Sequence, residues 1–174
     1  MCILTRDEIL SAVERGDIGI EPFVAQMVGP ASVDLHLGRS FRVFKPARRT
    51  VRIDGTSDYR ELSEKVLVPE GGTMLLMPGE TVLGLTLERV SLAPHLCGWL
   101  EGRSRFARVG LLVHISASFM HPGIHNHQVL EMTNFGPNPL ELVPGIPICQ
   151  FIFQRTVGEA VYQGTWAGQS SDDW

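Results

Sequence analysis

The sequence predicts a mainly β protein, a barrel or jelly-roll with one short helix at its N-terminus. Short apolar segments are separated by turns that contain Pro or Gly, and several segments alternate apolar with polar or small residues, as half-buried strands do. Only the beginning of the chain has a helical pattern, whereas a parallel sheet would need helical crossovers between its strands. We therefore expect a largely antiparallel sheet.

The expected helix comes first. Thr5 precedes Glu8 by three residues, the spacing of a capping box, and apolar residues then follow at helical intervals until Gly16. This pattern predicts a helix over residues 6–15.

The expected strands follow and are bounded by turns. They include residues 32–37, 73–77, 81–87 and 146–153. The polar window 48–65 has weak periodicity and predicts a surface loop.

Length and composition predict one domain over residues 1–174, because 174 residues with 44% hydrophobic side chains suffice for one packed core. The last residues, 167–174, are small and polar apart from Trp174. Such a tail either frays or folds over another part of the molecule.

Charge and composition exclude several classes of protein. A net charge of −4 provides no basic field for a nucleic-acid polymer, so any anion must be bound locally. No apolar run approaches the ~18 residues of a membrane helix, and the N-terminus lacks the order of a secretory signal. We therefore expect a cytoplasmic protein without a membrane partner. Cys2, Cys97 and Cys149 form no C-x-x-C pair and are expected to be buried, reduced thiols.

A basic cluster lies at residues 102–108, where three arginines and Ser104 occur within seven residues. A planar guanidinium donates two parallel hydrogen bonds to a phosphate, and the N–H groups at the start of a helical turn add further donors. The cluster is a candidate phosphate site. A solvated basic turn explains the same residues equally well.

Glu131 lies within an otherwise apolar strand pattern, Val129-Leu130-Glu131-Met132. A buried, unpaired carboxylate is costly, so the residue needs a partner or a function. A strand that turns Glu131 towards solvent is the alternative.

Histidines cluster before this strand, in His121-Pro122-Gly123-Ile124-His125-Asn126-His127. His125, His127 and Glu131 share one face of any strand, which is similar to part of the metal motif of cupins, although its glycine spacing and second half are missing. Exposed turn histidines are the alternative. The His-x-Glu and Pro-Cys-x-x-Cys motifs of zinc deaminases are also missing, so any deamination would proceed without zinc.

Several ordered motifs carry a resemblance to a known family. They are Ile20-Glu21-Pro22, the run Pro30-Ala31-Ser32-Val33-Asp34-Leu35-His36-Leu37-Gly38, Pro78-Gly79-Glu80, Gly102-Arg103-Ser104, Val129-Leu130-Glu131 and Cys149-Gln150. In these motifs the chain resembles the dCTP deaminases, of the trimeric dUTPase-like superfamily, over nearly its whole length. The resemblance implies a distorted β-barrel of the dUTPase type, a role in nucleotide metabolism, and a homotrimer with nucleotide sites at the subunit boundaries.

The resemblance also implies roles for particular residues. Glu131 would be the catalytic acid/base that takes a proton from water, so that hydroxide attacks C4 of cytosine and ammonia leaves. Ser104, Arg108 and the backbone carbonyl of Ala117 would hold that water. The implied nucleotide-binding positions are Arg103, Ser104, Arg105, Phe106, Ala107, Arg108, His121, Val129, Leu130, Glu131, Gln150, Tyr162, Thr165 and Gln169, with residues 160–174 as a lid over the site.

The sequence departs from the family pattern at a few positions. His121 stands where the family usually has the aspartate that contacts the deoxyribose, and Ile124-His125-Asn126 replaces the usual Trp-x-Gly. Thr165-Trp166 replaces a Lys-Tyr pair of the tail. These changes predict altered sugar recognition and weaker triphosphate binding.

The leading hypothesis is hydrolysis of dCTP to dUTP and ammonia, with Mg²⁺ carried by the triphosphate and no transition metal. The first alternative is a bifunctional enzyme that also cleaves the triphosphate and gives dUMP. A regulatory nucleotide-binding module without turnover and a metal-dependent cupin-like enzyme are alternatives from other classes.

Overall fold

The chain folds mainly into strands. The computed structural model describes residues 2–46, 50–54, 57–114, 116–167, 169 and 174. Its helical segments are α1 (Arg6–Glu14), the 3₁₀ turns η1 (Ala25–Met27) and η2 (Tyr59–Leu62), and the short α2 (Ser104–Ala107). Its strands are β1 (Ile18–Glu21), β2 (Val33–Phe44), β3 (Ser63–Leu67), β4 (Met74–Leu76), β5 (Thr81–Leu92), β6 (Leu96–Gly102), β7 (Leu111–Val113), β8 (Phe119–Met120), β9 (His125–Asn134), β10 (Leu140–Leu142) and β11 (Pro147–Arg155).

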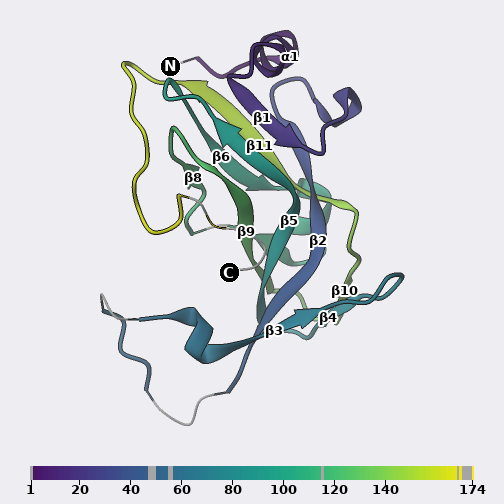
Figure 1. The fold of residues 1–174 in the computed structure, drawn as a ribbon. Coiled ribbons are helices and arrows are strands. Elements are labelled where there is room, and N and C mark those ends of the chain that lie inside the picture. Colours follow the sequence, from purple (N-terminus) through teal and green to yellow (C-terminus); the bar gives the residue numbers. More distant parts are fainter. Residues whose placement is uncertain (1, 47–49, 55–56, 115, 168, 170–173) are drawn as a thin grey trace.

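These strands form one large sheet and a separate pair (Figure 1). The large sheet has the order β7-β9-β5-β2-β11-β6-β8, with β1 paired to β5 and β3 paired to β2, and β10 pairs with β4. All of these pairs are antiparallel. The predicted mainly β, antiparallel class is confirmed, and the sheet curls into a half-barrel with α1 at one end (Figure 1).

Alternation along the central strands separates the core from a polar face. In β2, Val33, Leu35 and Leu37 are buried, while Asp34 and His36 between them are partly exposed. Strand β9 alternates in the same way, so that its even-numbered residues are buried and its odd-numbered residues reach the other face. Each of these strands thereby presents partly exposed side chains on the side that points away from the core.

A register shift in β5 shapes this face. Leu85 pairs with Val129 of β9, but the next pair along is Arg89 with His127, so β5 carries extra residues between them. Thr86 lies in this bulge, where its hydroxyl donates to the carbonyl oxygen of Glu88 at 2.7 Å and accepts from the backbone N–H of Gln128 at 3.0 Å. Side-chain hydrogen bonds therefore hold the bulge in place.

The N-terminal helix agrees closely with the prediction. Helix α1 begins at Arg6 and ends at Glu14, and Gly16 follows with a φ of 77°, a conformation that suits glycine. The side chain of Thr5 makes no capping hydrogen bond. Glu8 instead forms an ion pair with Arg155, at 2.7 Å, so the expected capping box is wrong because Glu8 has a partner on β11.

The predicted surface loop over residues 48–65 is wrong in its second half, where η2 and the start of β3 form. Tyr59 in this segment packs against the cluster of Leu83, Leu85 and Trp174, a contact between distant parts of the chain that local periodicity does not reveal. Residues 48, 49, 55 and 56 of the window lie outside the described residues.

The cysteines agree with the prediction in two of three cases. Cys97 and Cys149 are buried, whereas Cys2 is exposed. Burial raises the pKa of the Cys149 thiol well above its usual range, and the carboxylates of Glu88 and Asp34 raise it further. Cys149 is therefore a thiol rather than a thiolate at neutral pH.

The described helices are short, and the longest, α1, has 9 residues. None that the structure describes has the length and apolar character needed to span a bilayer.

Candidate active site

A cavity of about 510 Å³ lies against β9. Its walls come from β9, from the segment before β9 and from the C-terminal tail. The lining residues are Phe44, Tyr59, Leu83, His114, Ala117, Phe119, Met120, His121, Ile124, Asn126, His127, Gln128, Val129, Glu131, Tyr162, Trp166 and Gln169. Within this described lining, Glu131 is the single carboxylate and there is no lysine or arginine.

Glu131 is paired with His114. Oε2 of Glu131 lies 2.8 Å from Nδ1 of His114, and both atoms are buried without another partner in the described part of the chain. The His114 side chain is 5% exposed and that of Glu131 is 35% exposed, so the carboxylate reaches the cavity and the imidazole lies behind it. The backbone N–H of His114 also donates to the carbonyl oxygen of Glu131, at 2.8 Å, which fixes the two residues relative to each other.

His114 has an unusual backbone conformation, and its hydrogen bonds indicate which ring nitrogens carry protons. Its φ of 53° is in the left-handed region, which costs a residue with a side chain about 1–2 kcal/mol. Nε2 lies 3.1 Å from the carbonyl oxygen of Ala117. Because a carbonyl oxygen only accepts, Nε2 carries a proton, and Nδ1 is left to share a proton with Glu131.

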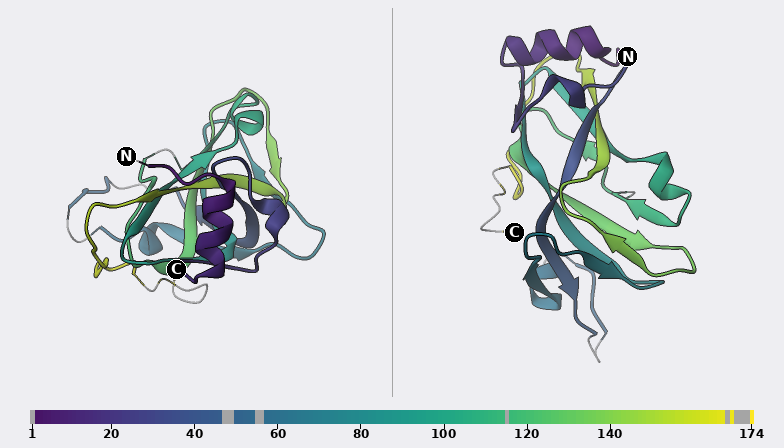
Figure 2. Two further views of the ribbon diagram at one scale, coloured as in Figure 1. Left: turned by 90° about the horizontal axis from the view of Figure 1, so that it is seen from above. Right: turned by 90° about the vertical axis from the view of Figure 1, so that its right-hand side faces the viewer.

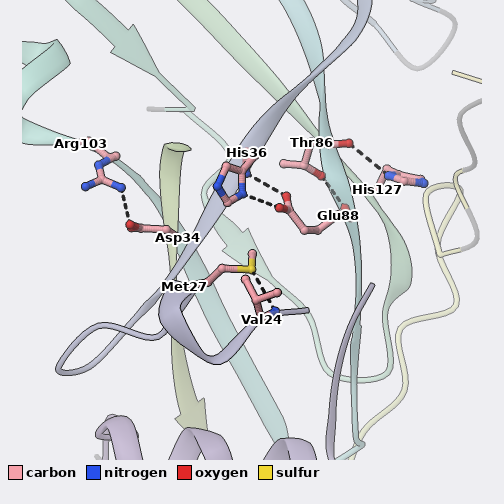
Figure 3. A network of polar contacts seen from close by, with 8 residues as sticks. All are labelled: Val24, Met27, Asp34, His36, Thr86, Glu88, Arg103 and His127. Carbon is pink, nitrogen blue, oxygen red and sulfur yellow. Dashed lines mark hydrogen bonds and ion pairs between the residues drawn. The ribbon is translucent and has the colours of Figure 1, made fainter. Parts of the chain in front are cut away.

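Buried amides lie beside this pair. Nε2 of Gln128 donates to Oδ1 of Asn126 at 2.7 Å, and Nδ2 of Asn126 donates to the carbonyl oxygen of Trp166 in the tail at 2.7 Å. Nδ1 of His127 lies 3.1 Å from the carbonyl oxygen of Thr86 in the β5 bulge (Figure 3). The polar side chains of β9 are thus held by the bulge on one side and by the tail on the other.

His121 belongs to an aromatic wall of the cavity. Its ring stacks on that of Tyr162, with 4.8 Å between centroids and 5° between planes. The ring of Phe119 meets it edge to face, with 4.9 Å between centroids. The backbone N–H of Tyr162 donates to the carbonyl oxygen of Pro122 at 2.9 Å, which fastens the tail to the turn that carries His121.

The tail has a second anchor at Trp174. The indole is 1% exposed and packs with Leu83 and Leu85 of β5. Its Nε1 donates to Oγ of Ser40 at 3.2 Å, and Nη2 of Arg42 donates to the backbone oxygen of Trp174 at 2.8 Å. Both hydrogen bonds lead to β2, so the end of the chain is held on the sheet.

Part of the predicted lid, residues 160–174, contributes to the cavity. Tyr162, Trp166 and Gln169 line it, whereas Thr165 is exposed and does not. Residues 168 and 170–173 of this segment lie outside the described residues.

The arginine turn, residues 102–108, lies elsewhere on the molecule. The guanidinium of Arg103 forms an ion pair with Asp34 of β2 (Figure 3). Ser104, Arg105 and Arg108 are exposed, and no residue of the turn lines the cavity. In both views of Figure 2, the segment that carries α2 and the C-terminal tail lie on opposite sides of the molecule.

The structure therefore divides the predicted site residues into two groups. Glu131, Ala117, His121, Val129, Tyr162 and Gln169 line the cavity. Those that do not are Arg103, Ser104, Arg105, Phe106, Ala107, Arg108, Leu130, Gln150 and Thr165.

Two residues of the second group have defined surroundings. The side chain of Leu130 is fully buried in the core, which leaves only its backbone available to a ligand. Gln150 pairs in register with Asp34 and accepts a hydrogen bond from Oγ of Ser32 at 3.1 Å, so it belongs to the region of the arginine turn.

Sequence reasoning missed His114, although it is the partner of Glu131. His114 follows the short strand β7, and the pairing of β7 with β9 brings it to the carboxylate. Asn126 and Gln128 were also missed, since they lie in the even-numbered, buried register of β9. A histidine after an apolar strand is a weak signal, and nothing local connects it to a residue 17 positions later.

The histidines of the cupin-like pattern have other contacts. Nε2 of His125 lies 3.5 Å from Nη1 of Arg89, and His127 is bound to Thr86. Across the ranges that the structure describes, no three His, Cys, Asp or Glu side chains form a group that could hold a metal ion.

The chain is similar in sequence to known dCTP deaminases. The sequence profile described as dCTP deaminase-like matches residues 3–156. A dUMP-forming dCTP deaminase of Corynebacterium diphtheriae is 42% identical over 150 residues, which cover 86% of this chain and 80% of the relative. A dUMP-forming dCTP deaminase of Methanopyrus kandleri is 38% identical over 160 residues, covering 89% and 82%. One of Salinispora tropica is 37% identical over 174 residues, covering 96% and 90%.

A solved structure has a similar fold. The crystal structure of 2′-deoxycytidine 5′-triphosphate deaminase from Agrobacterium tumefaciens matches with a TM-score of 0.68 at 18% identity. The match covers 88% of this chain and 48% of that one, so this chain spans about half the length of the solved protein. At this identity the likeness bears on the fold alone, and the predicted dUTPase-like fold is confirmed.

The relatives overturn one prediction from the sequence. The expected product was dUTP, whereas all three of these relatives are named as forming dUMP. The motifs behind the resemblance concern the base and the phosphates, which enzymes of both kinds must bind. They therefore do not distinguish the two products, and the bifunctional alternative replaces the leading hypothesis.

Proposed function

The chain belongs to the dCTP deaminase-like family of enzymes, and on that premise we propose that it hydrolyses dCTP to dUMP, ammonia and diphosphate. The observation that carries the proposal is the Glu131–His114 pair at a cavity of about 510 Å³. That volume is in the range of small-molecule sites, roughly 300–1,000 Å³. The cavity offers a carboxyl group able to carry a proton to and from a bound base, beside aromatic and amide walls.

Deamination needs a group that moves a proton from water to the leaving amine. In this proposal Glu131 takes a proton from water, and the hydroxide attacks C4 of cytosine. The same carboxyl then gives the proton to the amino nitrogen as the C4–N bond breaks and ammonia leaves. Positioned proton transfer of this kind contributes roughly 10²–10⁴-fold in rate.

His114 and Ala117 support this step. His114 holds the carboxyl through Nδ1 and the carbonyl oxygen of Ala117 through Nε2. The carbonyl oxygen has a second lone pair, which is able to accept a hydrogen bond from the attacking water. One imidazole thereby fixes the two groups that handle the water.

The phosphates require a second copy of the chain in this proposal. The described lining of the cavity has no lysine or arginine, whereas a triphosphate needs charge-assisted donors. Arg103, Ser104 and Arg108 carry such donors on the arginine turn, outside the cavity of the same copy. A closed symmetric assembly, the homotrimer implied by the family resemblance, brings the turn of one copy to the cavity of the next.

Two further parts of the proposal concern the tail and the metal. Tyr162, Trp166 and Gln169 cover the cavity, and the tail acts as a lid that excludes water during the reaction. We expect Mg²⁺ to enter with the triphosphate and no transition metal to take part.

Product analysis tests the proposal. The purified protein is incubated with dCTP and Mg²⁺, and dUTP, dUMP, diphosphate and ammonia are separated over time. We expect equal amounts of dUMP, ammonia and diphosphate without lasting dUTP. Release of dUTP alone would contradict the second hydrolysis, and nucleotide binding without turnover would favour a regulatory module.

A further inference from the structure

The second half of the proposed reaction needs a base of its own. Release of diphosphate requires water to attack the α-phosphorus, and that water must lose a proton. Glu131 is already used at C4 and is paired with His114. The other titratable side chains of the described lining are His121, His127, Tyr59 and Tyr162.

Three of these four groups are less suited to take a proton from the attacking water. A phenol holds its proton at neutral pH and so does not accept one from water, which excludes Tyr59 and Tyr162. Nδ1 of His127 is bound to the carbonyl oxygen of Thr86, and this residue lies within β9 itself, on the same strand as Glu131. His121 lies outside the strands, in the turn between β8 and β9.

The ring of His121 is oriented but its nitrogens are available. Tyr162 covers a face of the imidazole in a parallel stack, and Phe119 fixes it from a second direction. Both contacts are ring packing and not hydrogen bonds. Neither ring nitrogen of His121 has a hydrogen-bond partner among the described residues. An imidazole with a fixed plane and an open nitrogen is able to hold and deprotonate a water molecule.

Glu131 and His121 belong to the same cavity. Ala117 contacts His114 behind Glu131, and Ala117, Phe119, Met120 and His121 all line the cavity. Four residues of extended chain span at most about 14 Å. The cavity wall therefore leaves room for a nucleotide that has C4 at Glu131 and reaches His121 with its sugar and α-phosphate.

We propose that His121 is the general base of the diphosphate-releasing step, an inference that rests on the proposed function. A ring nitrogen takes a proton from water while the water oxygen bonds to the α-phosphorus. The bond from that phosphorus to the oxygen bridging the β-phosphorus breaks, and diphosphate leaves with the electron pair. The imidazolium then returns its proton to solvent, which balances the hydrolysis.

The variant His121→Asn tests the inference, because an amide keeps polarity and similar size but is not a base at neutral pH. With saturating dCTP and Mg²⁺, we expect diphosphate release to fall by roughly 10²–10⁴-fold, and by far more than ammonia release. dUTP should accumulate. His121→Asp, which restores a base at the same position, should recover dUMP formation in part.

His125→Asn is the matched control, since His125 is a neighbouring histidine that does not line the cavity. It should leave the ratio of dUMP to dUTP unchanged. Thermal unfolding of each variant, compared with the wild type, checks that the fold is intact.

Four outcomes would overturn the inference. The first two concern a folded His121→Asn: an unchanged product ratio, or an equal loss of ammonia and diphosphate release. The third is a failure of His121→Asp to recover any dUMP. The fourth is a selective loss of dUMP formation in His127→Asn. Each of them leaves the proposed function intact if the wild type forms dUMP. A wild type that releases only dUTP removes the proposed function itself, so the two failures are distinguishable.

Discussion

The cavity at Glu131 and the arginine turn at residues 102–108 differ in almost every physical respect. The cavity is walled by aromatic and amide side chains, and its described lining has one carboxylate and no cation. The turn is largely exposed and has three guanidiniums within seven residues. Each region offers half of what a nucleoside triphosphate needs. The segment with the turn lies on the opposite side of the molecule from the C-terminal tail (Figure 2), which contributes to the cavity wall. In the proposed function, proton transfer and phosphate binding therefore come from different copies of the chain.

The two regions are also held in place differently. The Glu131 cavity depends on distant contacts, from β7 through His114 and from the tail through Trp166 and Trp174. The arginine turn follows β6 directly and is fixed by the Arg103–Asp34 ion pair within the sheet. We expect changes in the cavity to alter the chemistry and changes in the turn to alter affinity.

The largest effect is expected for Glu131→Gln. The amide keeps the shape of the carboxylate but does not carry a proton, so ammonia release should fall by roughly 10²–10⁴-fold or more. Affinity for dCTP should stay within about tenfold of the wild type, because phosphate binding belongs to the other region. Ammonia assays and calorimetry measure the two quantities. Turnover that survives the substitution would remove Glu131 from the proton transfer.

A smaller, purely binding effect is expected for Arg108→Ala. A hydrogen bond to a charged group contributes about 1.5–3 kcal/mol, so triphosphate affinity should fall by about 10- to 150-fold. The loss should shrink from triphosphate to monophosphate and vanish for the nucleoside. Titration with dCTP, dCMP and deoxycytidine checks this, and equal losses for all three would place Arg108 away from the phosphates.

Mixing the two variants tests whether the regions come from different copies. If each site joins the cavity of one copy to the turn of its neighbour, chains refolded together from equal amounts of Glu131→Gln and Arg108→Ala form about a quarter of their sites intact. Activity should then return to about a quarter of the wild-type value. No recovery in the mixed assembly would mean that one chain supplies both regions.

A moderate effect on the lid is expected for Trp174→Ala. The substitution removes the buried indole and its hydrogen bond to Ser40, and loosens the contact with Arg42. The lost hydrogen bond to Ser40 contributes about 1 kcal/mol and the lost packing of the indole adds to it, so KM should rise by roughly fivefold or more. Steady-state kinetics measure it, with Phe135→Ala as a control because that ring is 83% exposed. An unchanged KM would show that the anchor does not hold the lid.

The smallest effect concerns the cysteine beneath the arginine turn. Cys149 pairs with Gly102 in the sheet, and burial together with Glu88 and Asp34 raises the pKa of its thiol. A raised pKa leaves little thiolate at pH 8, so iodoacetamide should modify Cys2 and spare Cys149 until the protein unfolds. Mass spectrometry of labelled peptides shows this directly. Rapid native labelling of Cys149 would mean that the base of the turn is open.

The strands were predictable because their signal is local. The period-2 alternation and the Pro- and Gly-containing turns each need only a few consecutive residues, and they predicted β2, β5 and β11. The pairing of these strands was not predictable in the same way. The half-barrel follows from contacts between distant segments, which no single window contains.

The site was predictable only where one motif contained it. Glu131 was singled out as a carboxylate in an apolar strand, and the arginine turn as a basic cluster. His114 was not, because the register of β7 against β9 brings it to Glu131. The separation of the cavity from the turn was also hidden, since motifs describe composition and not where each part lies in the fold.

The two tryptophans of the tail make its position measurable by tryptophan fluorescence. Trp174 is 1% exposed, whereas Trp166 is 41% exposed and lines the cavity. An indole emits at longer wavelength in water than in apolar surroundings, so detachment of the tail should shift the emission to the red. A bound nucleotide next to Trp166 should quench part of the remaining emission. Opening and closing of the tail are therefore measurable by intrinsic fluorescence, without a label and before any product has formed.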